Sequence, residues 1–259
     1  MRLFAALFAL ALAFVASACG GGGDARSAPR EATEPTAAAV PQPTRCRAGE
    51  DVDLVSSRRA YLAVAKRATR AYARPHGRVV HAFGRLNANR VDTVFGVLGM
   101  VVDRRCRPAW FRVELPIRPN GARGYVRARD VSIGTVETRI LVDVSDRRIE
   151  LFSRGRKILT TTAAVGSSAT PTPLGRYYVN QKLRVTDPSG PYGPGAIGIS
   201  AFSPVLTGWT QGGPIAIHGT DDPASIGRAV SNGCLRVQND VLRRLFSLVP
   251  AGTPVVIRA

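Results

Sequence analysis

Short runs of alternating apolar and polar residues, separated by turn residues, fill most of this 259-residue chain past Cys46. A period of two places successive side chains on opposite faces of a strand, so these runs predict half-buried β-strands. Only NDVLRRLFSLV, residues 239–249, has a convincing helical spacing, with Asn239 or Asp240 available as its cap. The sequence therefore predicts a mainly β protein with one or two short helices.

The first group of predicted strands lies between residues 68 and 131. Its candidates are ATRAYARP, RVVHAF, DTVFGVLG, WFRVELP and GYVRARDV, and RPNGARG (118–124) contains an Asn-Gly turn signal. Strands this short and close favour a small β-barrel, and the stretch resembles the SH3-like modules of bacterial wall proteins. We assign residues 45–132 to this module. His76 and His81 lack acidic or cysteine neighbours at ligand spacing, so we expect surface residues and no metal site.

The second group begins around Glu137. TRILVDVSDRRIELFSRG predicts a hairpin that turns at residues 145–147, and four more strands are expected in KILTTTAAVG, GRYYVNQK, PIAIHG and TPVVIR. Together with the helix at 239–249, these segments define a second, β-rich unit over residues 137–259.

The N-terminus has the pattern of an export signal. Met1 and Arg2 precede an apolar run that ends at Val15, and small residues follow, so residues 1–18 are interpreted as a signal peptide. Cys19 comes next, an arrangement that resembles a bacterial lipobox, in which the cysteine is lipidated; cleavage that leaves Cys19 unmodified is the alternative. Residues 19–44 are rich in Ala, Pro, Gly, Glu and Thr and predict a disordered tether. We expect an exported protein, anchored on the outer face of the cytoplasmic membrane and working in the cell wall.

Two further features bear on this setting. Cys46 and Cys106 are either a disulfide, which an exported protein can form, or two unrelated thiols. The net charge of +18 comes almost entirely from arginine. It suits anionic surroundings, although a GC-rich genome would produce the same bias. No run of basic residues suggests a nucleic-acid partner.

The stretch IAIHGTDDPASIGRAVSNGCLR, residues 215–236, holds the chemistry. A cysteine becomes a nucleophile as its thiolate, and His218 is the only histidine of the second unit that can take the proton from Cys234. Asp221, Asp222 or a backbone carbonyl around Gly219 can orient the imidazole. Cys234 follows Ser231, Asn232 and Gly233 in a tight turn, where the amides of residues 233 and 234 are candidates for an oxyanion hole. The alternative is a buried structural histidine and cysteine.

IHGT and SNGCLR resemble the signature of the L,D-transpeptidase (YkuD-domain) family. TPTPLGRYYV (170–179) and TRILVDVSDRRIELF resemble the family's upstream motifs, so the resemblance covers about residues 137–258. The family often has histidine where this chain has Asn232. Because the family's base is the earlier histidine, His218 here, the pair of Cys234 and His218 is retained.

The resemblance implies peptidoglycan chemistry. Cys234 would attack the third residue of a donor stem peptide, D-alanine would leave, and the amine of an acceptor stem would resolve the thioester into a 3→3 cross-link. Arg236, Tyr192 and Trp209 are candidates to contact substrate or to pack structurally. No cofactor or metal is implied, and the sequence leaves the oligomeric state open.

Three alternatives remain. An L,D-carboxypeptidase, or a transferase that attaches proteins to peptidoglycan, would use the same cysteine with a different acceptor. A non-catalytic wall-binding module would leave Cys234 unreactive. A nucleic-acid binder would explain only the charge, and the export signal argues against it.

Overall fold

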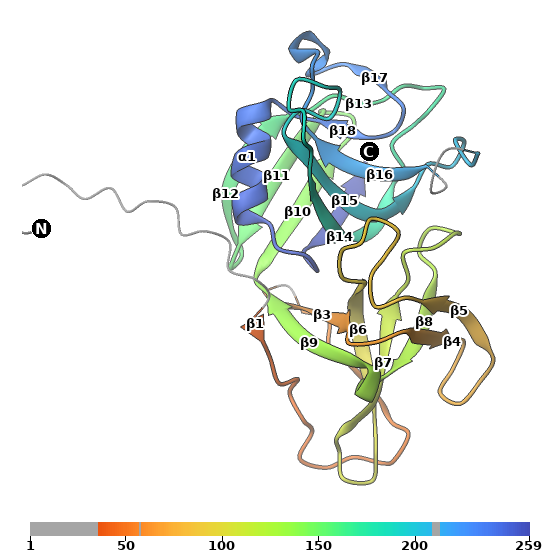
Figure 1. Ribbon diagram of the computed structural model, residues 1–259. Coiled ribbons are helices and arrows are strands. Elements are labelled where there is room, and N and C mark those ends of the chain that lie inside the picture. Colours follow the sequence, from red (N-terminus) through yellow and green to blue (C-terminus); the bar gives the residue numbers. More distant parts are fainter. Residues whose placement is uncertain (1–35, 57, 209–212) are drawn as a thin grey trace, which may run out of the picture. The chain divides into compact units, whose positions relative to one another are not determined.

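The computed structural model describes residues 36–56, 58–208 and 213–259 (Figure 1). The protein is mainly β, as predicted, and α1 (Asn239–Leu248) is the one α-helix of the described residues. Across these three ranges, no helix has the length and apolar composition to cross a membrane. Two large sheets contain most of the strands.

A nine-stranded sheet is built from the first part of the chain, with strand order β1-β9-β3-β6-β7-β8-β4-β5 and β2 paired to β6. A short 3-10 turn at Ala128–Asp130 separates β8 from β9. The strands are β1 (Thr36–Ala37), β2 (Asp51–Asp53), β3 (Ala60–Ala65), β4 (Thr69–Tyr72), β5 (Val79–Phe83), β6 (Val94–Val102), β7 (Pro108–Glu114), β8 (Arg123–Arg127) and β9 (Val131–Val136).

The predicted strands of this region correspond to β4 to β8, but its limits are wider than expected. β9 extends past residue 132. Within the predicted limits, β3 is a further strand that was not predicted. Residues 36–44 do not belong to a free tether: β1 pairs with β9, and Val40 is buried in the core of the sheet. Val40 supplies the apolar anchor that the rest of this stretch lacks. The resemblance to SH3-like modules stays a prediction.

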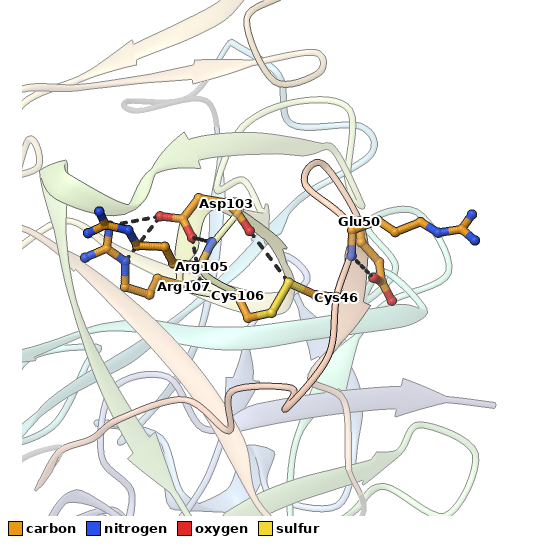
Figure 2. Close-up of a disulfide and its surroundings, with 7 residues drawn as sticks. Cys46, Glu50, Asp103, Arg105, Cys106 and Arg107 are labelled. Atoms are coloured by element: carbon orange, nitrogen blue, oxygen red, sulfur yellow. Dashed lines mark hydrogen bonds and ion pairs between the residues drawn. A yellow bond between two sulfur atoms is a disulfide. The ribbon is translucent and has the colours of Figure 1, made fainter.

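Cys46 and Cys106 form a disulfide that ties the segment before β2 to the turn between β6 and β7 (Figure 2). Cys106 has a φ of 57° in that turn. The Asp103 carboxylate accepts hydrogen bonds from the backbone N–H groups of Arg105 and Arg107 at 2.7 and 3.0 Å. On the Cys46 side, the Arg47 backbone N–H donates to the Glu50 carboxylate at 2.8 Å (Figure 2). The disulfide therefore joins two loops whose local shape is already held by hydrogen bonds.

An eight-stranded sheet follows, with strand order β12-β11-β10-β19-β14-β15-β16-β18. A two-stranded sheet pairs β13 with β17. The strands are β10 (Thr138–Asp143), β11 (Arg148–Ser153), β12 (Arg156–Thr162), β13 (Val165–Gly166), β14 (Gly175–Arg184), β15 (Gly195–Phe202), β16 (Pro214–His218), β17 (Ala229–Ser231), β18 (Leu235–Arg236) and β19 (Pro254–Arg258). A 3-10 turn at Pro223–Ser225 lies between β16 and β17.

Period-2 burial builds the core of the eight-stranded sheet. The predicted hairpin is confirmed, with Asp143 opposite Arg148, and Ile140, Val142, Ile149 and Leu151 are fully buried. α1 lies against this sheet (Figure 1) and adds Leu242 and Leu245 to the same core.

The predicted helix cap is wrong. The N-cap of α1 is Gln238, without a side-chain cap bond. The Asn239 side chain instead bonds both backbone groups of Thr220, accepting from its N–H at 2.8 Å and donating to its carbonyl at 3.0 Å. The start of the helix thus holds the segment that follows β16.

Candidate active site

Strands β16 and β18 run in parallel; His218 is the last residue of β16, and Cys234 directly precedes β18. Ile217 is opposite Leu235, and His218 is opposite Arg236. Ile217 and Leu235 are fully buried in the core. Because successive side chains alternate between faces, Cys234, directly before Leu235, shares the opposite face with His218 and Arg236. Cys234 and His218 are thus diagonal neighbours on one side of the sheet.

His218 is oriented by the backbone of the next residue. The residue is 5% exposed, and Nδ1 of its ring lies 2.6 Å from the Gly219 carbonyl oxygen. Since a carbonyl oxygen only accepts, Nδ1 carries the proton and Nε2 keeps its lone pair. Burial lowers the pKa of His218 to about 4, because its effect is larger than the opposing effect of the Gly219 hydrogen bond. The imidazole is therefore neutral at neutral pH, as a proton acceptor must be.

Cys234 is a half-buried free thiol. Burial raises its pKa, while the Ala216 backbone N–H and the charge of Arg236 act in the opposite direction. The same charge lowers the pKa of His218, so the Arg236 guanidinium acts on both members of the pair. A thiol with a raised pKa needs a base close by, because little thiolate is present at neutral pH.

The turn before Cys234 is held by its own hydrogen bonds. Ser231 Oγ donates to the Cys234 carbonyl at 2.5 Å and accepts from the Gly233 N–H at 3.1 Å. Gly233 has a φ of 107°, in a region that favours glycine. Its amide is committed to the turn, which corrects the expectation that it helps to form an oxyanion hole. Ser231 thus shapes the turn from inside.

Two threonines of the TPTP segment brace this turn from outside. Thr170 Oγ1 donates to the Ser231 carbonyl and Thr172 Oγ1 to the Gly233 carbonyl, both at 2.9 Å. The role of this segment was not predictable from the residues themselves. Asn239 was also missed as a site residue, because a polar residue at a helix start favours the interpretation as a cap.

A cavity of about 660 Å³ opens beside the pair. Cys234, Tyr192 and Asn232 line it, and the centroid of the Tyr192 ring lies 4.8 Å from that of His218. The candidate residue Trp209 lies outside the described residues, as does Cys19. Tyr192 and Asn232 are therefore placed where a molecule approaching Cys234 would meet them.

Comparison with known proteins identifies this part of the chain. Residues 137–257 match the family model of the L,D-transpeptidase catalytic domain, YkuD. The chain is 37% identical over 123 residues to the Bacillus licheniformis protein "Putative L,D-transpeptidase YkuD", covering 48% of this chain and 67% of that one. The chain belongs to the L,D-transpeptidase family. The Bacillus subtilis protein of the same name is 36% identical to this chain, with the same coverage of both chains.

Among solved structures, the L,D-transpeptidase from Mycobacterium smegmatis is similar, with 18% identity and a TM-score of 0.41. The similarity covers 64% of this chain and 90% of that one. The L,D-transpeptidase match starts one residue before β10 and ends within β19, so it contains the cavity-lining Cys234 and His218 beside it. The nine-stranded sheet lies before the matched region.

Proposed function

We propose that this protein is a peptidoglycan L,D-transpeptidase that forms 3→3 cross-links through a thioester on Cys234. One observation carries the proposal: His218 ends β16, Cys234 directly precedes the paired strand β18, and the free lone pair of His218 lies beside the cavity that Cys234 lines. Their position within an L,D-transpeptidase catalytic domain supports the same conclusion.

The reaction begins with proton transfer. His218 Nε2 takes the Cys234 proton as the sulfur attacks the carbonyl of the third stem residue, giving a tetrahedral intermediate. The bond to the D-alanine nitrogen breaks, and the imidazolium returns its proton to that amine. The product is an acyl-thioester on Cys234 and free D-alanine. The side-chain amine of an acceptor stem then attacks the thioester, forms the new amide and releases the thiol.

Electrostatics favour proton transfer during attack over a stable ion pair at rest. Burial disfavours the charged form of both partners, raising the pKa of Cys234 and lowering that of His218. Arg236 stabilises the thiolate as it forms and opposes charge on the imidazole. The Gly219 carbonyl stabilises the transient imidazolium through Nδ1. Asn232 lines the cavity as a neutral group and takes no part in proton transfer.

We also propose that the protein is exported, lipidated at Cys19 and held at the outer face of the cytoplasmic membrane. The signal-like segment and the cysteine directly after it support this. The tether in this proposal ends before residue 36, where β1 joins the nine-stranded sheet. The enzyme lipidated at Cys19 would then work within the peptidoglycan layer.

The test uses the chain from residue 20, incubated with a tetrapeptide muropeptide and analysed by mass spectrometry beside Cys234→Ala. A cross-linked dimer lacking one D-alanine, formed only by the wild type, supports the proposal. Tripeptide alone identifies an L,D-carboxypeptidase, and a muropeptide joined by an amide bond to a protein lysine identifies an attaching transferase, whereas a thioester on Cys234 is the intermediate of all three. No product in either sample refutes all three.

The assignment of the base has its own test. His218→Ala should suppress acylation at neutral pH far more than Asn232→Ala, because only His218 can accept the thiol proton. Equal effects of the two substitutions would contradict this assignment.

A further inference from the structure

One wall of the Cys234 cavity comes from outside the L,D-transpeptidase domain. Asn89 lies in the loop between β5 and β6 of the nine-stranded sheet, and it lines the cavity together with Cys234 and Tyr192. The family match begins only at residue 137. The nine-stranded sheet therefore contributes a side chain to the space in which the proposed chemistry takes place.

The loop that carries Asn89, residues 84–93, is held in shape by internal hydrogen bonds. Asn87 Oδ1 accepts from the Asn89 backbone N–H at 2.9 Å, and Thr93 Oγ1 donates to the Gly84 carbonyl at 2.8 Å. Such side-chain bonds replace the backbone pairing that a loop lacks. The loop consequently presents the Asn87 and Asn89 side chains in a defined position.

Both side chains bind one glutamine of the eight-stranded sheet. Asn87 Nδ2 and Asn89 Nδ2 donate to Gln181 Oε1 at 2.9 and 3.0 Å. A carbonyl oxygen has two lone pairs, and both are then used. Any bond from Gln181 to a ligand must therefore be donated by its Nε2. We call Asn87, Asn89 and Gln181 the amide cluster.

A glycine makes room for this arrangement. Gly198 is opposite Gln181 in the pairing of β14 and β15. A Cβ atom at residue 198 would lie 2.6 Å from Gln181 Cγ and 3.0 Å from Nε2. Gly198 thus lets the Gln181 side chain lie across β15, where both residues line the Cys234 cavity.

The amide cluster lies between two cavities. Asn89, Gln181 and Pro214 line the Cys234 cavity and also a second cavity of about 320 Å³, which adds Phe83 and Phe202. None of the described residues that line the Cys234 cavity has a charged side chain. This surface suits a ligand rich in uncharged amides, which exchange hydrogen bonds with carboxamide side chains.

We propose that the amide cluster is a binding subsite for the backbone amides of a stem peptide. Gln181 Nε2 donates to a peptide carbonyl, with Asn89 beside it at the cavity wall. The nine-stranded sheet is then part of the substrate site. The identity of the ligand rests on the proposed function, which supplies a peptide at Cys234.

The contacts between the two sheets explain how this wall keeps its position. The fully buried Tyr178 donates from its hydroxyl to the Val94 carbonyl at 2.9 Å. The Asn120 side chain accepts from the Phe202 N–H at 2.9 Å and donates to its carbonyl at 2.8 Å. Hydrogen bonds between the two sheets at Val94 and at Asn120 thus hold the loop in place at the cavity.

The test measures equilibrium binding of a tetrapeptide muropeptide to the full-length Cys234→Ala protein, which cannot consume it. Adding Asn89→Asp, which keeps the side-chain size but removes the donor, or Gln181→Ala should raise the Kd about five- to tenfold. Arg85→Ala is the matched control, since Arg85 is in the same loop but lines neither cavity; its Kd should stay within about twofold of the parent.

Equal Kd values in all four proteins would overturn the inference, and so would an absence of binding by Cys234→Ala itself. Binding that depends on Asn89 and Gln181, in a protein whose wild type releases no D-alanine, would keep the inference and refute the proposed function. Turnover by the wild type, with an unchanged KM in Asn89→Asp, would keep the proposed function and refute the inference. A separate Asn89→Asp protein that keeps Cys234 checks the loop: its rate of alkylation by iodoacetamide should equal that of the wild type. A changed rate would show that the loop had rearranged. In that case the Kd of Gln181→Ala decides whether the inference stands.

Discussion

Replacing Asn239 by alanine should destabilise the protein and slow acylation. The Asn239 amide makes two hydrogen bonds to the backbone of Thr220, which is only 2% exposed. Alanine would leave both backbone groups unpaired, at about 1–2 kcal/mol each. Its better helix propensity offsets about 0.6 kcal/mol. The net loss is about 1.4–3.4 kcal/mol, or a fall in Tm of about 3–14 °C for a chain of this length.

The effect on catalysis follows from the position of Thr220. It directly follows Gly219, whose carbonyl oxygen holds His218 Nδ1. Releasing this segment should misplace the imidazole and lower kcat about ten- to a hundredfold. Water would reach the ring, so the pKa of His218 should rise from about 4 toward its ordinary value. The acidic limb of the pH–rate profile would move with it.

Gln238→Ala is the matched control, because Gln238 precedes Asn239, is exposed and makes no side-chain cap bond. Its stability should stay within about 0.5 kcal/mol of the wild type. If Asn239→Ala melts and reacts like the wild type, the reasoning is refuted. A lower Tm with unchanged kcat and an unmoved acidic limb would restrict Asn239 to a structural role.

Three further predictions concern stability. The unfolded chain binds its histidine proton near pH 6.5 and folded His218 only near pH 4, so unfolding free energy should fall by about 3 kcal/mol across that window on acidification; urea titrations of wild type and His218→Gln should differ in this slope. The double substitution Cys46→Ser with Cys106→Ser opens a loop with a sequence separation of 60 and should cost about 4 kcal/mol; the reduced wild type should unfold at the same urea concentration, and a difference would contradict the loop-closure argument. Gly233→Ala combines a φ of 107° with a Cβ 3.0 Å from Ile215 and should cost about 1–3 kcal/mol; an unchanged Tm would show that the turn relaxes freely.

Alternation of residue types predicted many of the strands but not all of them. β10 and β11 alternate cleanly and were found, since one face of each is buried. β15 has a nearly unbroken buried pattern between β14 and β16, and its glycines and alanines weaken the strand signal. β3 is rich in alanine and was missed for the same reason. Strands buried on both faces leave no period of two to detect.

The residues that carry the proposed chemistry were predictable, whereas their supports were not. A histidine and a cysteine beside glycines identified His218 and Cys234, and the Gly219 carbonyl was one of the expected orienting groups. Thr172, Asn239 and Asn89 are ordinary polar residues whose importance comes from what they touch. The Gly233 amide was a candidate for an oxyanion hole, yet it donates to Ser231 Oγ within the turn.

The sequence by itself determined the mainly β class, the family and the pair of reactive residues, because these depend on residue type and on spacing over short segments. Only the tertiary structure decided which backbone groups orient His218 and hold the turn at Cys234, and which residues close the cavity. Asn87 and Gln181 are 94 residues apart and meet through strands of different sheets. Such a contact leaves no periodic trace in the chain, since it arises only after both sheets have formed and packed.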